Sequence, residues 1–201
     1  MYRSSILVLA LVLAASMPAA AQTCTASSSW VNNPTLPTSL DESNQCNFQI
    51  FSWQSFLALM QPANSNQLVF ETYMSSDGMF PPDGLHPLPW GKTPWPPTLG
   101  SVTKQAGSSN DLIAQSGVEV QYDLAVNQAM YNYISSNMLY NATCFNAGGN
   151  NVHMPPAVDP DTNPQSIELK VAWLPMSPCD GTKYHCVKAL VNGQLTSVGL
   201  I

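Results

Sequence analysis

The sequence predicts an α+β fold, with a mostly antiparallel sheet, two main helices and long Pro-rich loops. Two segments carry apolar residues at helical spacing, and several others alternate apolar and polar residues as half-buried strands do. Seven prolines fall between Phe80 and Pro97, which forbids a regular ladder there. Because strands and helices interleave without a regular βαβ period, we do not expect a doubly wound parallel sheet.

The N-terminus has the order of features of a secretory signal. Arg3 supplies positive charge, residues 6–15 form an apolar run, and residues 19–21 are the small residues that a signal peptidase requires. We therefore predict a signal peptide at 1–21 and a secreted or periplasmic protein. No later apolar stretch approaches 18 residues, so no transmembrane segment is expected after signal removal.

Composition narrows the possible partners. Hydrophobic residues make up 45% of the chain, and charged residues only 9%, against about 25% in ordinary domains. Arg3 is the only arginine, so after the signal five lysines face twelve acids. Binding to a nucleic-acid backbone requires clustered Lys and Arg. We expect no nucleic-acid partner, and instead a small molecule or another protein.

Export also places the cysteines in an oxidising compartment, where disulfides are the default. The local pairings Cys24–Cys46 and Cys179–Cys186 are predicted, which leaves Cys144 as the odd cysteine. We predict an irregular N-terminal arm at 22–45, tied down by the first bridge, and a single domain at 46–201.

The first helix is predicted over 47–60. Asn44 or Asn47 can cap its start, and Pro62 stops it. It is apolar around most of its circumference, so we expect it to be heavily buried. Residues 67–74 are β-branched and aromatic and predict a strand.

An ordered loop is predicted over residues 80–97, and a mobile insertion over 100–110. Residues 112–114 and 118–124 predict a hairpin that turns at Gly117. Asn127 can cap a second helix that runs to about Leu139.

The C-terminal part predicts an irregular stretch over 141–165 and a strand over 166–174 that alternates cleanly. A final hairpin, 184–191 with 194–201, is predicted around Asn192-Gly193, because both residues tolerate the positive φ of a type I′ turn.

Several of these motifs, taken in order, resemble a family of exported bacterial proteins of unassigned function. They are W-Q-x-F-L-A-L at 53–59, L-Y-N at 139–141 and I-E-L-K-x-A-W at 167–173, and the resemblance covers about residues 45–201. In that family the chain continues past the position of Gly199-Leu200 with a His-containing strand and an aromatic stretch. The resemblance therefore implies that this chain is C-terminally truncated, and it implies no activity.

The most promising functional feature is the loop at 80–97. Trp90 and Trp95 can present flat faces to a sugar or peptide at small entropic cost, with His86 and Lys92 supplying polar contacts. These four residues are the predicted ligand-binding set. Such tryptophans more often fold back over a sheet and shield a thin core, and the sequence leaves both roles open.

Catalytic and metal signatures are weaker, and we predict neither catalytic residues nor a cofactor. The His and Met side chains that could bind copper are not spaced to chelate one ion. Disulfide formation competes with zinc for the thiols of Cys179 and Cys186. The ligands considered were His86 with Met79, His153 with Met154, and His185, alone or with Cys179 and Cys186. No catalytic pair can be named among the acids Glu71, Glu119, Asp123 and Glu168.

The function predicted from the sequence is therefore an exported module that binds a small molecule or a partner. Two other function classes remain as alternatives. One is a metal- or redox-linked exported enzyme whose key residues lie partly beyond Ile201. The other is a structural envelope protein.

Overall fold

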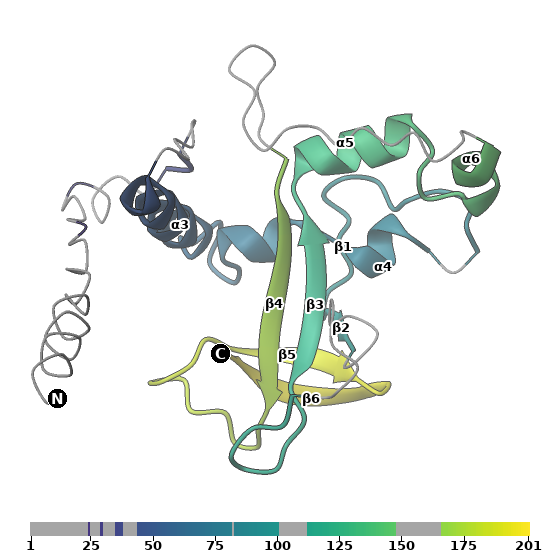
Figure 1. Ribbon diagram of the computed structural model, residues 1–201. Helices are drawn as coiled ribbons and strands as arrows, with labels where there is room; N and C mark the ends of the chain where they lie inside the picture. Colours follow the sequence, from purple (N-terminus) through teal and green to yellow (C-terminus); the bar gives the residue numbers. More distant parts are fainter. Residues whose placement is uncertain are drawn as a thin grey trace, which may run out of the picture.

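The computed structural model describes Cys24, Ser29 and residues 35–37, 44–81, 83–100, 112–147 and 166–201. Within them, six strands form one curled sheet in the order β1-β3-β4-β6-β5-β2 (Figure 1). All neighbouring strands are antiparallel except β2 and β5, which are parallel. Two main helices accompany this sheet, which confirms the predicted α+β class. The signal at 1–21, most of the arm at 22–45, the predicted insertion at 100–110 except Gly100, and residues 148–165 of the predicted irregular stretch lie outside the described residues.

Strands β3 (Gln121–Val126) and β4 (Glu168–Pro175) lie side by side in the sheet. They pair from Gln121 opposite Trp173 to Val126 opposite Glu168. The predicted alternation of β4 is confirmed, since Trp173 is buried whereas Glu168 and Lys170 are exposed. Lys170 places its ammonium group 4.4 Å from the centre of the Tyr122 ring on β3.

The hairpin β5 (Cys186–Val191) and β6 (Gln194–Leu200) crosses the lower ends of these strands (Figure 1). Asn192 and Gly193 have φ values of 50° and 74°, so the predicted turn is confirmed. β2 (Thr98–Leu99) follows the Pro-rich loop and pairs with β5. Residues 112–120 form a short hairpin closed by the Ile113–Glu119 bridge, as predicted, although the long ladder with β4 begins only at Gln121.

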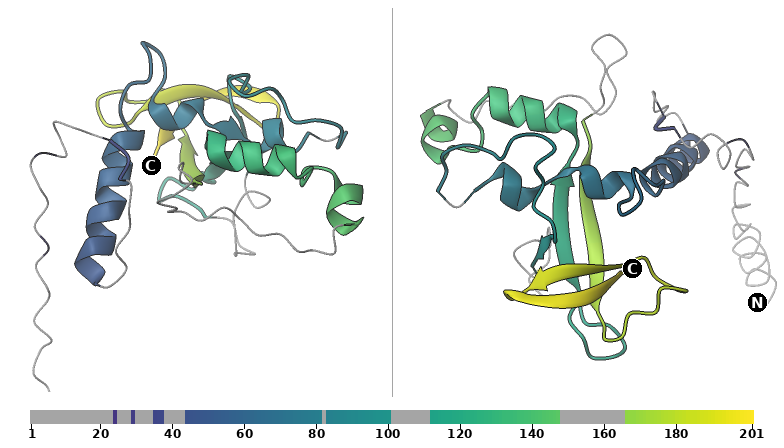
Figure 2. Two further views of the ribbon diagram at one scale, coloured as in Figure 1. Left: turned by 90° about the horizontal axis from the view of Figure 1, so that it is seen from above. Right: turned by 180° about the vertical axis from the view of Figure 1, so that it is seen from behind.

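Helix α3 (Gln45–Leu59) begins two residues before the predicted start. Of the two predicted caps, Asn44 is the one used, and its side chain accepts a hydrogen bond from the Asn47 N–H at 2.9 Å. The prediction of heavy burial is wrong, because Ala58 is its only buried residue. The helix lies beside the sheet and leaves one face uncovered by the described residues (Figure 2). Since α3 is apolar all round, that face exposes Phe48, Trp53 and Phe56.

The predicted strand at 67–74 is also wrong. Val69–Thr72 form a 3₁₀ helix, η1, and only Met74–Ser75 pair as β1. The Leu68 N–H donates to Glu71 Oε2 at 2.7 Å and thereby closes a helical turn. Phe70 and Glu71 follow one another in the chain and are both buried. In a strand that covers a core with one face, consecutive side chains point to opposite faces, so only one of the two would be buried. A short helix, α4 (Ser76–Met79), follows.

Helix α5 (Gln128–Ser136) is capped by Asn127, as predicted, and buries Met130 and Ile134. It ends before the predicted Leu139, and Met138 lies exposed beyond it at φ 52°. The stretch from 141 was predicted to be irregular, but Ala142–Ala147 form helix α6. The Asn141 side chain accepts from the Cys144 N–H at 3.2 Å and so caps this turn.

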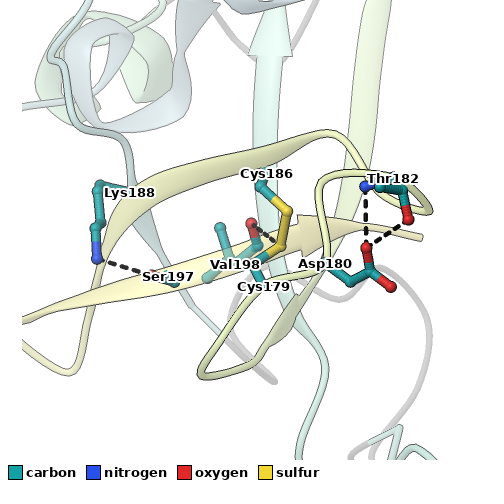
Figure 3. The surroundings of a disulfide bond; sticks show 7 residues. All are labelled: Cys179, Asp180, Thr182, Cys186, Lys188, Ser197 and Val198. Carbon is teal, nitrogen blue, oxygen red and sulfur yellow. Dashed lines mark hydrogen bonds between the residues drawn. A yellow bond between two sulfur atoms is a disulfide. The ribbon is translucent and has the colours of Figure 1, made fainter.

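Both predicted disulfides, Cys24–Cys46 and Cys179–Cys186, are present, and Cys144 carries a free thiol. The second bond joins the segment after β4 to the start of β5, with the Cys179 sulfur 3.6 Å from the Val198 carbonyl oxygen (Figure 3). Two disulfides indicate an oxidising, extracytoplasmic compartment. Among the described residues, no helix has the length and apolar character needed to cross a membrane.

Most of the buried apolar side chains form two clusters. The hairpin-side core gathers residues from η1, β2, β4, β5 and β6, namely Phe70, Leu99, Trp173, Ala189 and Val198. The methionine core lies around β1, α4 and α5 and contains Met74, Met79, Met130 and Ile134. Trp90 and several tyrosines pack against the methionine core.

Candidate functional site

The Pro-rich loop separates the four predicted ligand-binding residues. Trp90 is half-buried against Tyr131, with ring centres 5.4 Å apart, and belongs to the shell of the methionine core. His86 Nδ1 lies 3.1 Å from the Tyr140 hydroxyl. Lys92 is exposed, and its backbone N–H donates to the Pro89 carbonyl. Of these four residues, Trp95 lines a groove.

Trp95 is held at the surface by its neighbours. Pro94 and Pro96 flank it and restrict the backbone. The Thr93 hydroxyl donates to the Tyr73 carbonyl at 3.0 Å and so fixes this part of the loop to the segment before β1. The Trp95 side chain remains 45% exposed.

Trp95 lines a groove of about 540 Å³, which we call the Trp95 groove. Its other walls are mostly polar, and they consist of Asn64, Asn66, Gln67, Glu71, Thr72, Gly91 and Thr93. His86, Trp90 and Lys92 do not line it. The lining therefore offers amide and hydroxyl groups beside one indole ring, and it contains no lysine.

The polar wall of the Trp95 groove is pre-organised by its own hydrogen bonds. The Asn64 amide donates to Gln67 Oε1 at 3.1 Å, and the Asn66 N–H donates to Asn64 Oδ1 at 2.9 Å. The Thr72 hydroxyl donates to the Val69 carbonyl at 2.7 Å. These bonds fix the 64–72 segment and leave the Asn66 side-chain amide without a partner among the described residues.

A second, mostly apolar groove of about 430 Å³ lies between α3 and β4, and we call it the β4-edge groove. Helix α3 contributes Phe56 and Leu59, η1 contributes Phe70, and the C-terminal end of β6 contributes Leu200. The remaining lining residues are Met60, Leu169, Lys170, Val171, Ala172, Lys183, Tyr184, His185 and Ile201. Its charged lining residues are lysines, without a carboxylate.

An ionisable pair, with a buried carboxylate and a partly exposed imidazole, connects the two grooves. His185, in the wall of the β4-edge groove, places Nε2 2.9 Å from Oε1 of Glu71. The Glu71 side chain is 1% exposed, and its other oxygen accepts from the Leu68 N–H. Glu71 therefore orients the imidazole while it closes the turn of η1.

Sequence reasoning missed this pair because 114 residues separate the two partners. Glu71 and His185 were considered only in separate catalytic and zinc sets. Cys179 and Cys186 form a disulfide and so offer no thiolate for zinc. Glu71 belongs to η1, Glu119 to the short hairpin at 112–120 and Glu168 to the start of β4. His153 and Met154 lie outside the described residues. In the described part of the chain, no group of three or more His, Cys, Asp or Glu side chains is placed to hold a metal ion.

Comparison of the chain with protein-family models, with curated proteins and with solved structures finds no match. The resemblance to a family of exported bacterial proteins, and the truncation that it implies, therefore stay predictions.

Proposed function

We propose that this protein is a secreted or periplasmic binding module that holds a small polar ligand of the saccharide class against Trp95. The observation that carries the proposal is an exposed indole at the wall of a polar groove of about 540 Å³. Small-molecule sites combine an aromatic surface with a few convergent polar groups in this way.

The polar groups of the Trp95 groove favour a hydroxylated ligand. Side-chain amides such as those of Asn64 and Asn66 can both donate and accept, as sugar hydroxyls do. The groove has no lysine to attract an anionic ligand. Trp95 offers a large contact area while only two side-chain torsions have to be fixed.

The proposal is tested with three neutral probes, cellotriose, maltotriose and chitotriose, each titrated to 10 mM. We expect at least one of them to quench tryptophan emission and to release heat in calorimetry. Trp95→Ala should weaken that binding by about tenfold or more, which corresponds to about 1.4 kcal/mol. Its melting temperature should stay close to that of the wild type, because the side chain is exposed.

Trp90→Ala is the matched control, since it removes an indole from the same loop outside the groove. It should lower the melting temperature and preserve probe binding in the folded protein. Absence of binding by all three saccharides would overturn the saccharide class. A loss of stability on Trp95→Ala as large as that on Trp90→Ala would favour a shielding role for Trp95 instead.

Two other function classes predicted from the sequence stay predictions. For a metal- or redox-linked exported enzyme, metal analysis of the untagged protein should find stoichiometric copper, zinc or iron. For a structural envelope protein, light scattering should show stable self-association without any ligand.

A further inference from the structure

A small cavity of about 20 Å³ adjoins the Trp95 groove, and we call it the Trp173 chamber. It shares Glu71, Thr93 and Trp95 with the lining of the groove, so the two spaces meet at these side chains. Its remaining lining residues come from the segment 70–73, the Pro-rich loop, β3 and β4, and they are Phe70, Tyr73, Pro94, Pro97, Asp123, Ala125, Val171 and Trp173. The chamber therefore lies between one face of the sheet and the segments that cover it.

The Trp173 indole brings a hydrogen-bond donor to this chamber. Trp173 is 2% exposed, and its Nε1–H has no hydrogen-bond partner among the described residues. Buried donors in native proteins are nearly always paired, because a donor that leaves water without gaining a partner costs free energy. An acceptor that enters the chamber would therefore gain a bond that the described part of the fold does not use.

The Asp123 carboxylate brings an acceptor to the same face of the sheet. Asp123 on β3 lies opposite Val171 on β4, and Trp173 follows two residues later on β4. Asp123 and Trp173 are thus diagonal neighbours on one face, an arrangement in which Cα atoms lie about 7–8 Å apart. Asp123 Oδ1 is shielded from solvent, and a carboxylate can accept several hydrogen bonds at once. One hydroxyl group can bridge such a donor and acceptor, because a hydroxyl both accepts and donates.

The walls of the chamber are fixed by contacts of their own. Glu71 Oε2 accepts from the Leu68 N–H, and Glu71 Oε1 lies 2.9 Å from His185 Nε2. The Thr93 hydroxyl donates to the Tyr73 carbonyl at 3.0 Å. Because these groups are already held in place, a ligand group can enter without reordering the wall, which lowers the cost of binding.

The volume of the chamber limits its occupant to one small polar group. A water-sized oxygen requires roughly 10–15 Å³, so about 20 Å³ accepts a hydroxyl but no sugar ring. In a hexose ring form, the hydroxymethyl group carries its hydroxyl on a carbon outside the ring. It can therefore enter the chamber while the ring stays in the groove against Trp95. The lining contains no lysine that would favour a phosphate in its place.

We propose that the Trp173 chamber binds the hydroxymethyl group of a hexose unit whose ring lies against Trp95. The Trp173 Nε1–H donates to the hydroxyl oxygen, and the hydroxyl donates to the Asp123 carboxylate. This inference rests on the proposed saccharide binding and adds its specificity, which is for hexoses over sugars that lack this hydroxyl. A site that pairs a ligand hydroxyl in a shielded chamber discriminates strongly against the analogue without it, because its own buried groups then stay unpaired.

The first test changes only the ligand. Cellotriose, maltotriose and chitotriose are each compared with a deoxy analogue, in which every hydroxymethyl group is replaced by a methyl group. Calorimetry measures the dissociation constants, and the parent saccharide that binds most tightly should bind about tenfold or more better than its deoxy analogue. In isotope-labelled wild-type protein, the indole N–H resonance of Trp173 should shift with that parent saccharide, and it should shift less with the deoxy analogue.

The second test removes the donor and the acceptor from the protein. Replacement of Trp173 alone by benzothienylalanine exchanges the indole N–H for sulfur and keeps the fused rings. The loss of affinity on deoxygenation should then fall below about threefold. The same replacement at Trp90, which lines neither the chamber nor the Trp95 groove, is the matched control and should keep the full loss. Asp123→Leu removes the acceptor at similar volume, so the loss should again fall below about threefold.

The outcomes separate this inference from the proposed function. If none of the three saccharides binds, both are overturned together. If a saccharide binds and its deoxy analogue binds equally well, only the chamber assignment is overturned. An undiminished loss in the benzothienylalanine protein or in Asp123→Leu would exclude that residue as the donor or the acceptor. Cross-relaxation between the Trp173 indole proton and water that persists at saturating saccharide would show that the chamber holds water alone. If either variant does not fold, the paired saccharides and the wild-type Trp173 resonance decide the question.

Discussion

The two cores of this protein differ in composition and in how they are covered. The methionine core contains three methionines and Ile134, and the Pro-rich loop covers it with Trp90. The hairpin-side core is built on Phe70 and Trp173, and its shell residues Leu59, Leu169 and Leu200 line an open groove. Methionine adapts to irregular spaces, whereas large rings require a fitted environment. The comparison teaches that the core built on large rings lies beside an open groove, while the core built on methionines is closed by a loop.

The largest effect on the free energy of unfolding is expected from a substitution in the hairpin-side core. Trp173 is 2% exposed and packs against Phe70 with ring centres 6.2 Å apart. Trp173→Ala should therefore lower the free energy of unfolding by about 3–5 kcal/mol. Met74→Leu, in the methionine core, should lower it by less than about 1.5 kcal/mol, because the volume is nearly conserved. Urea unfolding of both variants measures the contrast, and similar losses would show that the two cores do not differ in rigidity.

A smaller effect is expected from added volume in the methionine core. A Cβ at Gly78 would lie 2.6 Å from the sulfur of Met74, which is fully buried. Gly78→Ala should cost about 1–3 kcal/mol in the free energy of unfolding. Gly181→Ala is the control, since nothing lies within 4 Å of its Cβ position. A neutral result at Gly78 would mean that Met74 moves aside freely, which would sharpen the picture of an adaptable core.

The smallest effect on the free energy of unfolding at neutral pH is expected from a substitution of Tyr73. This residue lies in the chain between Phe70 of the hairpin-side core and Met74 of the methionine core. Burial raises the pKa of the Tyr73 phenol above its ordinary value near 10.0. Folding thus favours the neutral phenol. Its contribution to the stability of the fold is fully present below the pKa of the phenol in the unfolded chain, and it is lost as the pH rises through the pKa of the phenol in the folded protein. Tyr73→Phe should change stability by less than about 1 kcal/mol at pH 7.

Above pH 10 the stability of the wild type should fall more steeply than that of Tyr73→Phe. The difference between their melting temperatures from pH 8 to 11 checks this prediction. Parallel curves would show that the phenol is hydrated in the folded protein.

The elements that the sequence predicted correctly depend on local signals. Asn44 and Asn127 cap their helices, Asn192-Gly193 forms its turn, and β4 alternates. Each of these features needs only neighbouring residues. The two disulfides join cysteines separated by 22 and 7 positions, which local pairing also captured.

The errors arose where a distant contact decides the outcome. Residues 69–72 have β-forming side chains, yet the contacts of Glu71 with Leu68 and His185 stabilise a 3₁₀ turn. The burial of α3 depends on what covers its second face, which its own apolar residues do not reveal. Trp90 and Trp95 are equivalent in the sequence, but only the position of Tyr131 explains why one is covered. The β4-edge groove likewise needs the register between β4 and β6, which no motif encodes.

The small ring closed by Cys179 and Cys186 also affects the unfolded chain. Closing a loop over a sequence separation of 7 removes conformations from the unfolded ensemble, which stabilises the fold by roughly 2–3 kcal/mol in the chain-entropy model. That amount is a sizeable part of the roughly 5–15 kcal/mol that holds a typical domain folded. In a thiol-reducing environment the unfolded chain would regain those conformations, and the β5–β6 hairpin beside the ring would be held by its hydrogen bonds and packing without the covalent bond. The stability of the β5–β6 hairpin, and of the β4-edge groove beside it, is therefore linked to the oxidation state of its surroundings.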